Sequence, residues 1–268
     1  MDNIFVNGKS LDDCTRAELR DALRERSRPM PIHAHVGVAV ASGGQSWDAH
    51  TETLVKMIPS STRNYIKVTP LRSIGSSIAM NQNEMLGMAY KAGCSHIFFF
   101  ENDESIDPND DRYDDAIIRL VSHDKDIVGA TYMFKTYSLT DPLDVDIRAM
   151  GGEVDGTAID WRTLYSRPEL TKVGGLPIGC LMIKMGVFEK IVKGNPQFPV
   201  FYHDVTLQKK VRTTDYVFCS NARQLGFDVW LDAPLSLRMK HWGAFPYQFP
   251  KAVPAGVGGT CVVDGCET

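Results

Sequence analysis

The chain has 268 residues, of which 43% are hydrophobic and 23% charged, and its formal net charge is −4. This length suits one large domain or two small ones with a hydrophobic core, and the composition excludes an intrinsically disordered chain. No apolar run approaches the roughly 18 residues that a membrane helix needs, and residues 1–30 lack the apolar segment of a secretory signal. We therefore expect a soluble, cytoplasmic protein. The mildly acidic balance argues against a protein that coats nucleic acid or binds anionic membranes.

The negative charge is concentrated in one segment. Eight acidic residues and one basic residue lie between Glu101 and Asp115, so this segment carries −7 and the remaining residues sum to +3. Like charges at this spacing repel one another. Solvent and salt, or a bound cation, would offset that repulsion.

The two ends of the chain differ from its middle. Residues 15–18, which read Thr-Arg-Ala-Glu, match a capping box and predict a short helix that ends before Pro29. We interpret residues 1–30 as an N-terminal helical extension and residues 31–243 as the main domain. Residues 244–268 are rich in Pro and Gly and are expected to form a tail or a flap.

From residue 36 onward, apolar strand patterns alternate with helical patterns. Strands are predicted over 36–40, 65–68, 96–100 and 126–132, with helices over 77–91 and around 117–121. The run 96–100 is apolar on both faces, which is typical of a central strand in a covered sheet. This succession predicts an α/β fold with a mostly parallel sheet between two helical layers. Such sheets bind ligands beyond the carboxyl ends of their strands.

The second half of the chain is less regular. Residues 135–176 are expected to form loops and short hairpins. A helix capped by Thr214 and ended by Gly226 is predicted there. The other elements predicted there are a helix over 187–192 and strands over 181–183, 229–231 and 236–239.

Two carboxylates follow the buried strand 96–100 directly. Glu101 and Asp103 have one residue between them, so both can address one hard cation through oxygen. A solvated acidic turn is the other interpretation, but the position at a strand end favours a metal or diphosphate site. The later acids, from Asp107 to Asp115, fit turn residues and first-turn acids of a helix better.

Four stretches follow one another in a distinctive order, namely residues 98–104 (FFFENDE), 126–130 (DIVGA), 213–219 (TTDYVFC) and 241–243 (HWG). In this order they resemble the GT-A fold glycosyltransferases, above all the compact family 2-like enzymes common in bacteria and phages. The resemblance covers residues 34–243 and implies a Rossmann-like α/β/α sandwich that binds a nucleotide sugar. It implies a UDP-sugar first, although the Asp-Asp-Gly-Ser motif of many family members is missing and leaves the base open.

The resemblance also implies a metal site. Glu101 and Asp103 would hold Mn²⁺ or Mg²⁺ against the diphosphate of the donor, with Glu101 in place of the usual first Asp. His241 would join the same metal. Two carboxylates and one imidazole form a mixed oxygen and nitrogen set that suits Mn²⁺.

The catalytic base implied by the resemblance is Asp215. Its carboxylate would take the proton from an acceptor hydroxyl as that oxygen attacks the anomeric carbon, a one-step displacement that inverts this centre. The metal would stabilise the charge on the departing nucleoside diphosphate. Taken without the resemblance, an Asp just after a Thr cap is also a routine helix start.

The resemblance implies further contacts with the donor. The nucleoside site begins after the first strand, and a glycine-containing loop at 173–180 lines the donor sugar and the acceptor. At residues 79–81 the family often has Ala-Arg-Asn, and the missing Arg removes a possible phosphate contact. The candidate donor-binding residues are Ser42, Gly43, Asp48, Asn81, Asn102 and Gly179.

The acceptor and the reaction each leave alternatives. Lys209, Lys210 and Arg212 precede Asp215 and would favour an anionic acceptor, such as a phosphorylated lipid, a charged glycan or a hydroxymethylated DNA base, as modified by related phage enzymes. A base within a duplex would have to be flipped out. A sugar-phosphate nucleotidyltransferase is disfavoured because the loop after the first strand has no Lys or Arg before Lys56. The remaining alternative is a binding module without catalysis.

Overall fold

The structure is a computed structural model, and it describes residues 5–6, 9–10, 15, 33–42, 48–106, 115–135, 147–194, 199–205, 211–243 and 246–250. The chain divides into two units, residues 1–33 and 34–268. In the first unit, β1 (Phe5–Val6) pairs with β2 (Lys9–Ser10) in antiparallel fashion. The predicted helix after Thr15 and the segment after residue 250 lie outside the described residues.

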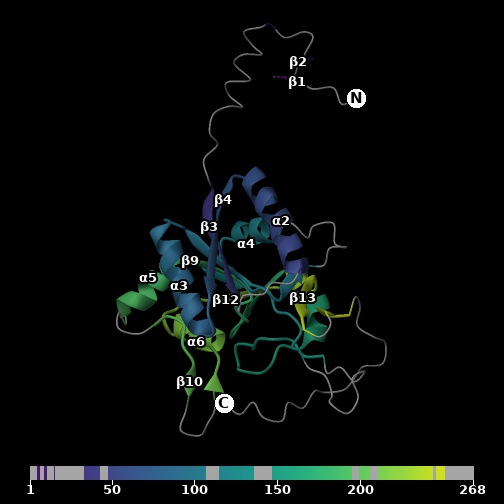
Figure 1. The fold of residues 1–268 in the computed structure, drawn as a ribbon. Helices are drawn as coiled ribbons and strands as arrows, with labels where there is room; N and C mark the ends of the chain where they lie inside the picture. The colour runs from purple at the N-terminus through teal and green to yellow at the C-terminus, as the bar shows by residue number, and fades with distance from the viewer. Residues whose placement is uncertain are drawn as a thin grey trace. The chain divides into compact units, whose positions relative to one another are not determined.

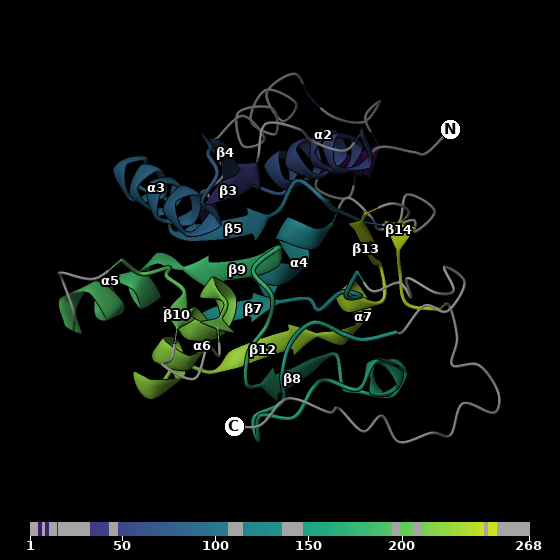
Figure 2. The ribbon, with the colours of Figure 1, turned by 60° about the horizontal axis from the view of Figure 1, so that its bottom comes forward.

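The second unit is built on a seven-stranded sheet with the order β4-β3-β5-β9-β7-β12-β8 (Figure 2). Five strands run in one direction, and β8 and β9 run in the other. This confirms the predicted α/β fold with a mostly parallel sheet. The sequence patterns do not predict that β9 runs antiparallel between β5 and β7. The strands are β3 (Ala34–Ser42), β4 (Ile66–Ile74), β5 (His96–Phe100), β7 (Ile127–Gly129), β8 (Leu170–Val173), β9 (Cys180–Lys184) and β12 (Val229–Asp232).

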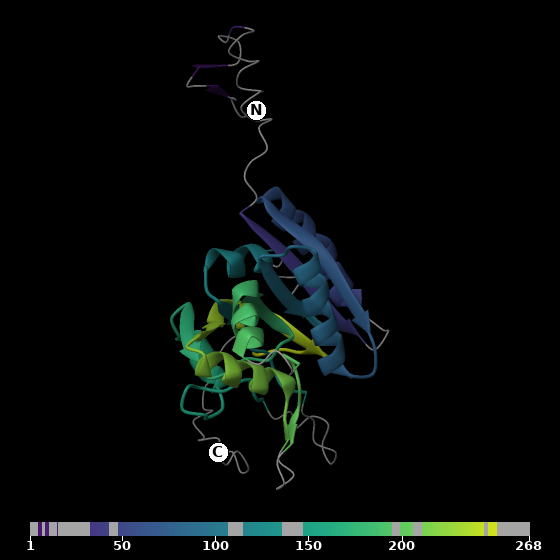
Figure 3. The same cartoon turned by 90° about the vertical axis from the view of Figure 1, so that its left-hand side faces the viewer.

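Helices cover both faces of this sheet, as expected. One core packs under α3, α5 and α6, and the other packs under α2, α4 and α7. Figure 1 shows α2 and α3 on opposite sides of β3 and β4, and Figure 3 shows α3 lying along these strands. The helices are α2 (Asp48–Arg63), α3 (Ile78–Lys91), α4 (Ala116–Ser122), α5 (Met185–Gly194), α6 (Thr214–Gln224) and α7 (Ala233–Ser236), with a 3-10 helix, η2, at Trp161–Tyr165.

The central strand β5 contributes to both cores. Ile97 and Phe99 face one core, whereas Phe98 and Phe100 face the other, and all four side chains are buried. Each of these side chains removes a large apolar area from water, worth roughly 1.5–3 kcal/mol for a fully buried aliphatic or aromatic side chain. The carboxyl end of β5 is therefore held in the interior of the domain.

A smaller antiparallel sheet lies beyond the carboxyl end of β5 (Figure 2). It consists of β6 (Glu104–Ile106), β13 (Met239–Trp242) and β14 (Pro246–Tyr247). Its register places His241 opposite Glu104. A two-stranded ribbon is formed by β10 (Asp204–Val205) and β11 (Val211–Arg212).

Two elements differ from the sequence expectations. Residues 236–239 are not a strand, because Asp232 accepts a hydrogen bond from Leu235 N and caps the short helix α7, so β13 begins only at Met239. The sequence patterns also do not predict the helix α2, which contains Pro59 and many hydroxyl side chains. The buried hydroxyls of Thr53 and Ser61 donate to carbonyl oxygens of the same helix, which satisfies them in the interior.

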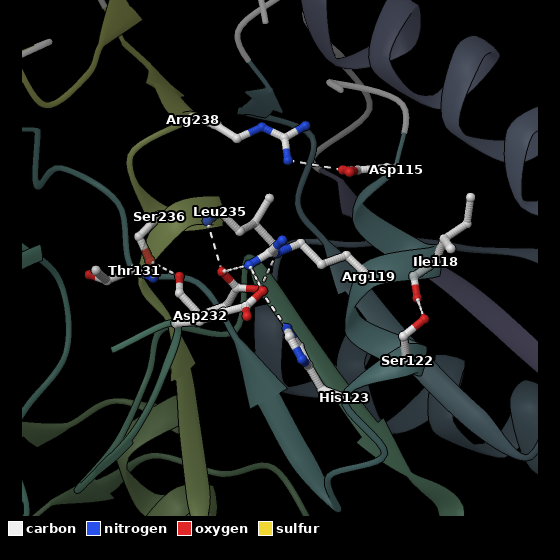
Figure 4. A network of polar contacts seen from close by, with 11 residues as sticks. Asp115, Ile118, Arg119, Ser122, His123, Thr131, Asp232, Leu235, Ser236 and Arg238 are labelled. Atoms are coloured by element: carbon white, nitrogen blue, oxygen red, sulfur yellow. Dashed lines mark hydrogen bonds and ion pairs between the residues drawn. The ribbon is translucent and has the colours of Figure 1, made fainter. Parts of the chain in front are cut away.

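A buried carboxylate joins α4, β12 and α7 (Figure 4). Asp232 has no exposed surface, and its oxygens accept hydrogen bonds from Arg119 Nε at 2.5 Å and Arg119 Nη2 at 3.1 Å. His123 Nε2 lies 2.8 Å from Asp232 Oδ2, and Leu235 N donates to Oδ1 at 2.9 Å. These contacts tie α4 to β12 and α7.

The same network positions the chain that leaves β7. Ser236 Oγ donates to the carbonyl oxygen of Asp232 and accepts from Thr131 N at 3.0 Å. Thr131 lies two residues after the end of β7, at the carboxyl edge of the sheet. The network therefore fixes a segment that leads towards the residues described below.

We expect Asp232→Asn to lower the free energy of unfolding by about 3 kcal/mol, because it removes one charge of a buried, hydrogen-bonded ion pair. The measurement is denaturant unfolding followed by circular dichroism. Asp124→Asn is the matched control, since Asp124 is exposed and pairs with Lys184 Nζ at 2.7 Å. Exposed pairs contribute little, so this variant should unfold close to the wild-type midpoint, and equal effects of the two substitutions would contradict the role of the network.

Candidate functional site

Acidic side chains gather where β5 ends. The chain turns after Phe100, with Glu104 N donating to the carbonyl oxygen of Glu101 at 3.0 Å, and enters β6. Glu101 N donates to the carbonyl oxygen of Gly179 at 3.2 Å, which anchors the turn to the start of β9. The turn is thus held between the large sheet and the small one.

Three side chains converge at this turn. Asp103, Glu104 and His241 each present one ligand atom, and these atoms all lie within 4.8 Å of one another. His241 Nε2 lies 3.5 Å from Asp103 Oδ2 and 3.4 Å from Glu104 Oε1. Trp242 N donates to the carbonyl oxygen of Asp103 at 2.7 Å, so the pairing of β13 with the turn and β6 brings the imidazole to the carboxylates.

The orientation of His241 leaves Nε2 directed at the carboxylates. Nδ1 lies 2.9 Å from the carbonyl oxygen of Met133, which can only accept, so Nδ1 carries a proton. Tyr132 packs edge-on against the ring at 4.9 Å between centroids. A neutral imidazole would therefore direct the lone pair of Nε2 at two carboxylate oxygens. Because all three atoms are electron-rich acceptors, a proton or a cation between them is needed to offset their repulsion.

Glu104 is the most buried of the three. Its side chain has no exposed surface, and within the described residues neither carboxylate oxygen meets the geometry of a hydrogen bond. Burial, with the negative charges of Asp103 and Glu101, raises the pKa of Glu104 well above its usual range. The nearby Tyr132 hydroxyl and Lys135 offset part of this effect, but an ionised carboxylate at this depth is costly, and a divalent cation would stabilise it.

Asp103 has the opposite character. Burial raises the pKa of its carboxyl, but His241 and Lys135 together outweigh this effect and lower the pKa to about 2. Lys135 Nζ lies 2.5 Å from Asp103 Oδ2. The ionised Asp103, the oxygens of Glu104 and the imidazole of His241 fit a cation such as Mn²⁺, which accepts mixed oxygen and nitrogen ligands.

Glu101 lies outside this group of three. Its Oε1 is buried, and burial, with the charges of Asp103 and Asp215, raises the pKa of Glu101 to about 8. Asp215, which lies in the first turn of α6 and far from Glu101 in the chain, contributes to this raised pKa. Glu101 thus links the group of three to Asp215.

Asp215 is buried in the first turn of α6, with 7% of its surface exposed. Thr213 Oγ1 and Tyr216 N both donate to its Oδ1, the latter at 3.1 Å. Burial raises the pKa of Asp215, although these hydrogen bonds offset part of the effect. The structure thus places the predicted base at the edge of the sheet where the acidic turn lies.

Tyr132 and Gly179 pack together beside Glu104. Burial, followed by the charges of Glu104, Glu101, Asp103 and Asp215, raises the pKa of Tyr132 well above its usual range. A Cβ on Gly179 would collide with the Tyr132 hydroxyl and lie 3.2 Å from Glu104 Cγ. Gly179 thus makes room for the Tyr132 side chain, and this contact lies within the loop at 173–180 that is expected to line the donor.

The other predicted donor-binding residues lie around the neighbouring strands. Asn81 is buried and braces the loop after β4, since it accepts from Ser73 Oγ at 3.1 Å and donates to the carbonyl oxygen of Gly75 at 3.2 Å. Ser42 ends β3, and Asp48 is exposed at the start of α2. Asn102 is half-buried in the acidic turn, and Gly43 lies outside the described residues.

Sequence reasoning does not single out three residues of the site. Glu104 adjoins the acid pair but reads as one more acid of a charged run, whereas Tyr132 and Lys135 lie in an unremarkable segment after β7. Only the adjacency of Glu104 to Asp103 could have drawn attention to it. The other two depend on how the segment after β7 folds onto β13.

Comparisons with known proteins add two likenesses. No protein-family model and no curated protein sequence matches the chain. Among solved structures, A197 from STIV is similar with a TM-score of 0.49 and 16% identity, covering 82% of this chain and 97% of that one. Mannose-1-phosphate geranyltransferase from Thermus thermophilus has a TM-score of 0.35 and 10% identity, covering 60% of each chain. Both TM-scores lie below 0.5, so the fold class rests on the sheet itself.

Among the described residues, no helix combines the length and the apolar character required to cross a membrane.

We expect Mn²⁺ to stabilise the folded protein and Glu104→Gln to remove this effect, because Gln has nearly the same shape as Glu104 but cannot supply an anionic ligand. A ligand at about 100 times its Kd adds about 2.7 kcal/mol to the free energy of unfolding. Thermal unfolding with and without Mn²⁺ measures it. Glu169→Gln is the control, since Glu169 is exposed and pairs with Arg119, and an unchanged response of Glu104→Gln to Mn²⁺ would remove Glu104 from the site.

We expect the metal-free protein to lose stability as the pH rises from about 5 to 8. The folded-state pKa of Glu101 is about 8, above its ordinary value, so the folded protein keeps a proton that the unfolded chain has released. This stabilisation is present at low pH and is lost as the pH passes 8, and it amounts to a few kcal/mol at about 1.4 kcal/mol per pKa unit. Unfolding in EDTA across this range should give a flatter profile for Glu101→Gln, and parallel profiles would refute the assignment.

Proposed function

We propose that this protein is a metal-dependent inverting glycosyltransferase, which moves a sugar from a nucleotide-sugar donor to an acceptor hydroxyl. The observation that carries the proposal is the pairing of two features at one sheet edge. One is the group of Asp103, Glu104 and His241, which can hold a cation. The other is the buried carboxylate of Asp215, whose charge acts on Glu101 in the same turn.

Asp103, Glu104 and His241 would hold Mn²⁺ or Mg²⁺. When bound, this cation supplies positive charge that stabilises the diphosphate leaving group of the donor. The resemblance also assigns Glu101 to the metal, and the charges of Asp103 and Asp215 both raise the pKa of this residue. With a pKa of about 8, Glu101 is uncharged at neutral pH in the metal-free protein and adds no negative charge beside Asp215.

Asp215 would act as the general base. The hydrogen bonds from Thr213 Oγ1 and Tyr216 N both reach Oδ1, and Oδ2 would accept the proton of an acceptor hydroxyl. The acceptor oxygen forms a bond to the anomeric carbon as the bond from that carbon to the diphosphate oxygen breaks, and the diphosphate leaves with the electron pair. Burial makes Asp215 a stronger base than an ordinary carboxylate, and the single displacement inverts the anomeric centre.

The acceptor is proposed from the charge near Asp215. Arg212 is exposed three residues before Asp215 and lies 3.7 Å from Asp204 Oδ2 in the ribbon of β10 and β11. The other two members of the basic run, Lys209 and Lys210, lie outside the described residues. This basic run supports an anionic acceptor, namely a hydroxymethylated DNA base, a charged glycan or a phosphorylated lipid.

We expect a screen of UDP-, GDP- and TDP-sugars with Mn²⁺ or Mg²⁺ to find one donor that the protein hydrolyses slowly and transfers faster when an acceptor is present. Asp215→Asn should lower transfer by about 10²–10⁴-fold, which is the usual contribution of a general base, and should leave donor binding intact. Asp228→Asn is the control, since Asp228 forms an exposed ion pair with Lys172 at 2.6 Å.

The products separate the alternatives. An inverted glycoside and a free nucleoside diphosphate support the proposal, whereas pyrophosphate released from a nucleoside triphosphate and a sugar phosphate would identify a nucleotidyltransferase. Donor binding without turnover, unchanged in Asp215→Asn, would identify a binding module. Hydroxymethylated DNA, glycan and lipid acceptors are compared in parallel.

A further inference from the structure

A lysine already occupies the candidate cation site. Lys135 Nζ lies 2.5 Å from Asp103 Oδ2, the same oxygen that lies 3.5 Å from His241 Nε2. The ammonium therefore stands beside one of the three residues that would hold a metal. Two cations on one carboxylate oxygen repel each other at such distances, so a metal bound to Oδ2 competes with the ammonium for it.

The position of Lys135 is built into the fold. The preceding residues are fixed, because Met133 O bonds to His241 Nδ1 at 2.9 Å and Phe134 N donates to the carbonyl oxygen of Arg148 at 2.7 Å. The aliphatic part of Lys135 lies beside Gly243, where an added Cβ would lie 3.0 Å from Tyr247 Cε2 and 3.3 Å from Lys135 Cδ. Lys135 thus reaches Asp103 from a segment whose backbone is held and whose side chain is closely packed at Gly243.

The displaced ammonium needs a new partner. Its stem of four methylene groups is flexible and its charge is compact and strongly hydrated, so it can move a short way but stays near the site. A diphosphate bound to the cation brings negative oxygens to this place, and Lys is a common point-charge partner of phosphate. If the metal binds alone, the Lys135 ammonium loses its contact with Asp103. If the metal binds together with a diphosphate, the diphosphate oxygens replace Asp103 as the partner of the ammonium.

We propose that Lys135 is a resident counter-ion and positioning residue, which holds Asp103 in the metal-free protein and moves to the diphosphate of the donor when the metal binds. This inference rests on the proposed function for the identity of the diphosphate ligand. Its consequence is a coupling between the two ligands. Metal binds weakly alone and tighter with a nucleoside diphosphate, and the nucleoside diphosphate gains equally from the metal.

The test measures Mn²⁺ binding by titration calorimetry, alone and with UDP, GDP or TDP. Lys135→Met should bind Mn²⁺ alone about tenfold tighter than the wild type, because no ammonium competes, whereas its affinity for the nucleoside diphosphate with Mg²⁺ in excess should fall about tenfold, within the usual range of coupling between sites. Lys135→Arg keeps the positive charge, so it should still bind Mn²⁺ weakly alone and more tightly with the nucleoside diphosphate, as the wild type does. Lys172→Met, which breaks an exposed pair with Asp228, should change neither affinity.

Changes of opposite sign separate this role from a structural one, since a damaged site would weaken both ligands. Mn²⁺ binding that is unchanged or weaker in Lys135→Met, or a coupling as large as in the wild type, overturns the inference. If Lys135→Met does not fold, Lys135→Gln serves instead, because it also removes the ammonium and should likewise tighten Mn²⁺ binding. These measurements are equilibria without turnover, so a failed donor screen would refute the proposed reaction and leave the result for Lys135 standing.

Discussion

The burial of several carboxylates at one strand end is the constraint on which the site depends. The strand β5 is apolar on both faces, so its end lies inside the domain, and the acidic turn that follows starts from the interior. Glu101, Glu104 and Asp215 all have raised pKa values, whereas Lys135 and His241 keep Asp103 ionised. Positive charge is therefore needed here, and a lysine, a histidine and a divalent cation are the candidates to supply it.

The surrounding architecture holds these groups together against their repulsion. The register of β6 and β13 sets His241 opposite Glu104, and the antiparallel β9 brings Gly179 under the turn. Gly179 leaves room for the Tyr132 hydroxyl beside Glu104. The network around Asp232 holds α7, which leads into β13, and the segment after β7 that carries Lys135. These strands and the Asp232 network thus hold together a group of like charges that would otherwise repel one another.

Local patterns predict much of the fold. The strands β3, β5, β9 and β12 and the helices α3 and α6 are expected because apolar periodicity, caps and glycines mark them, such as Ser77 before α3 and the left-handed Gly93 after it. The helix α2 escapes such patterns because its buried face carries hydroxyl groups that only the folded helix can satisfy. The short α7 replaces a predicted strand because its cap, Asp232, is also the partner of Arg119 in another element.

The presence of two acids after a buried strand follows from the amino-acid pattern alone, because an apolar run of five residues and the charges after it are local features. Which groups meet there depends on how distant segments fold together. His241 joins Asp103 and Glu104 through the pairing of strands that are far apart in the chain, and Lys135 reaches the same carboxylate from the segment after β7. Such contacts depend on register and on side-chain direction, which no local pattern contains, whereas the position of an acid after a buried strand needs neither.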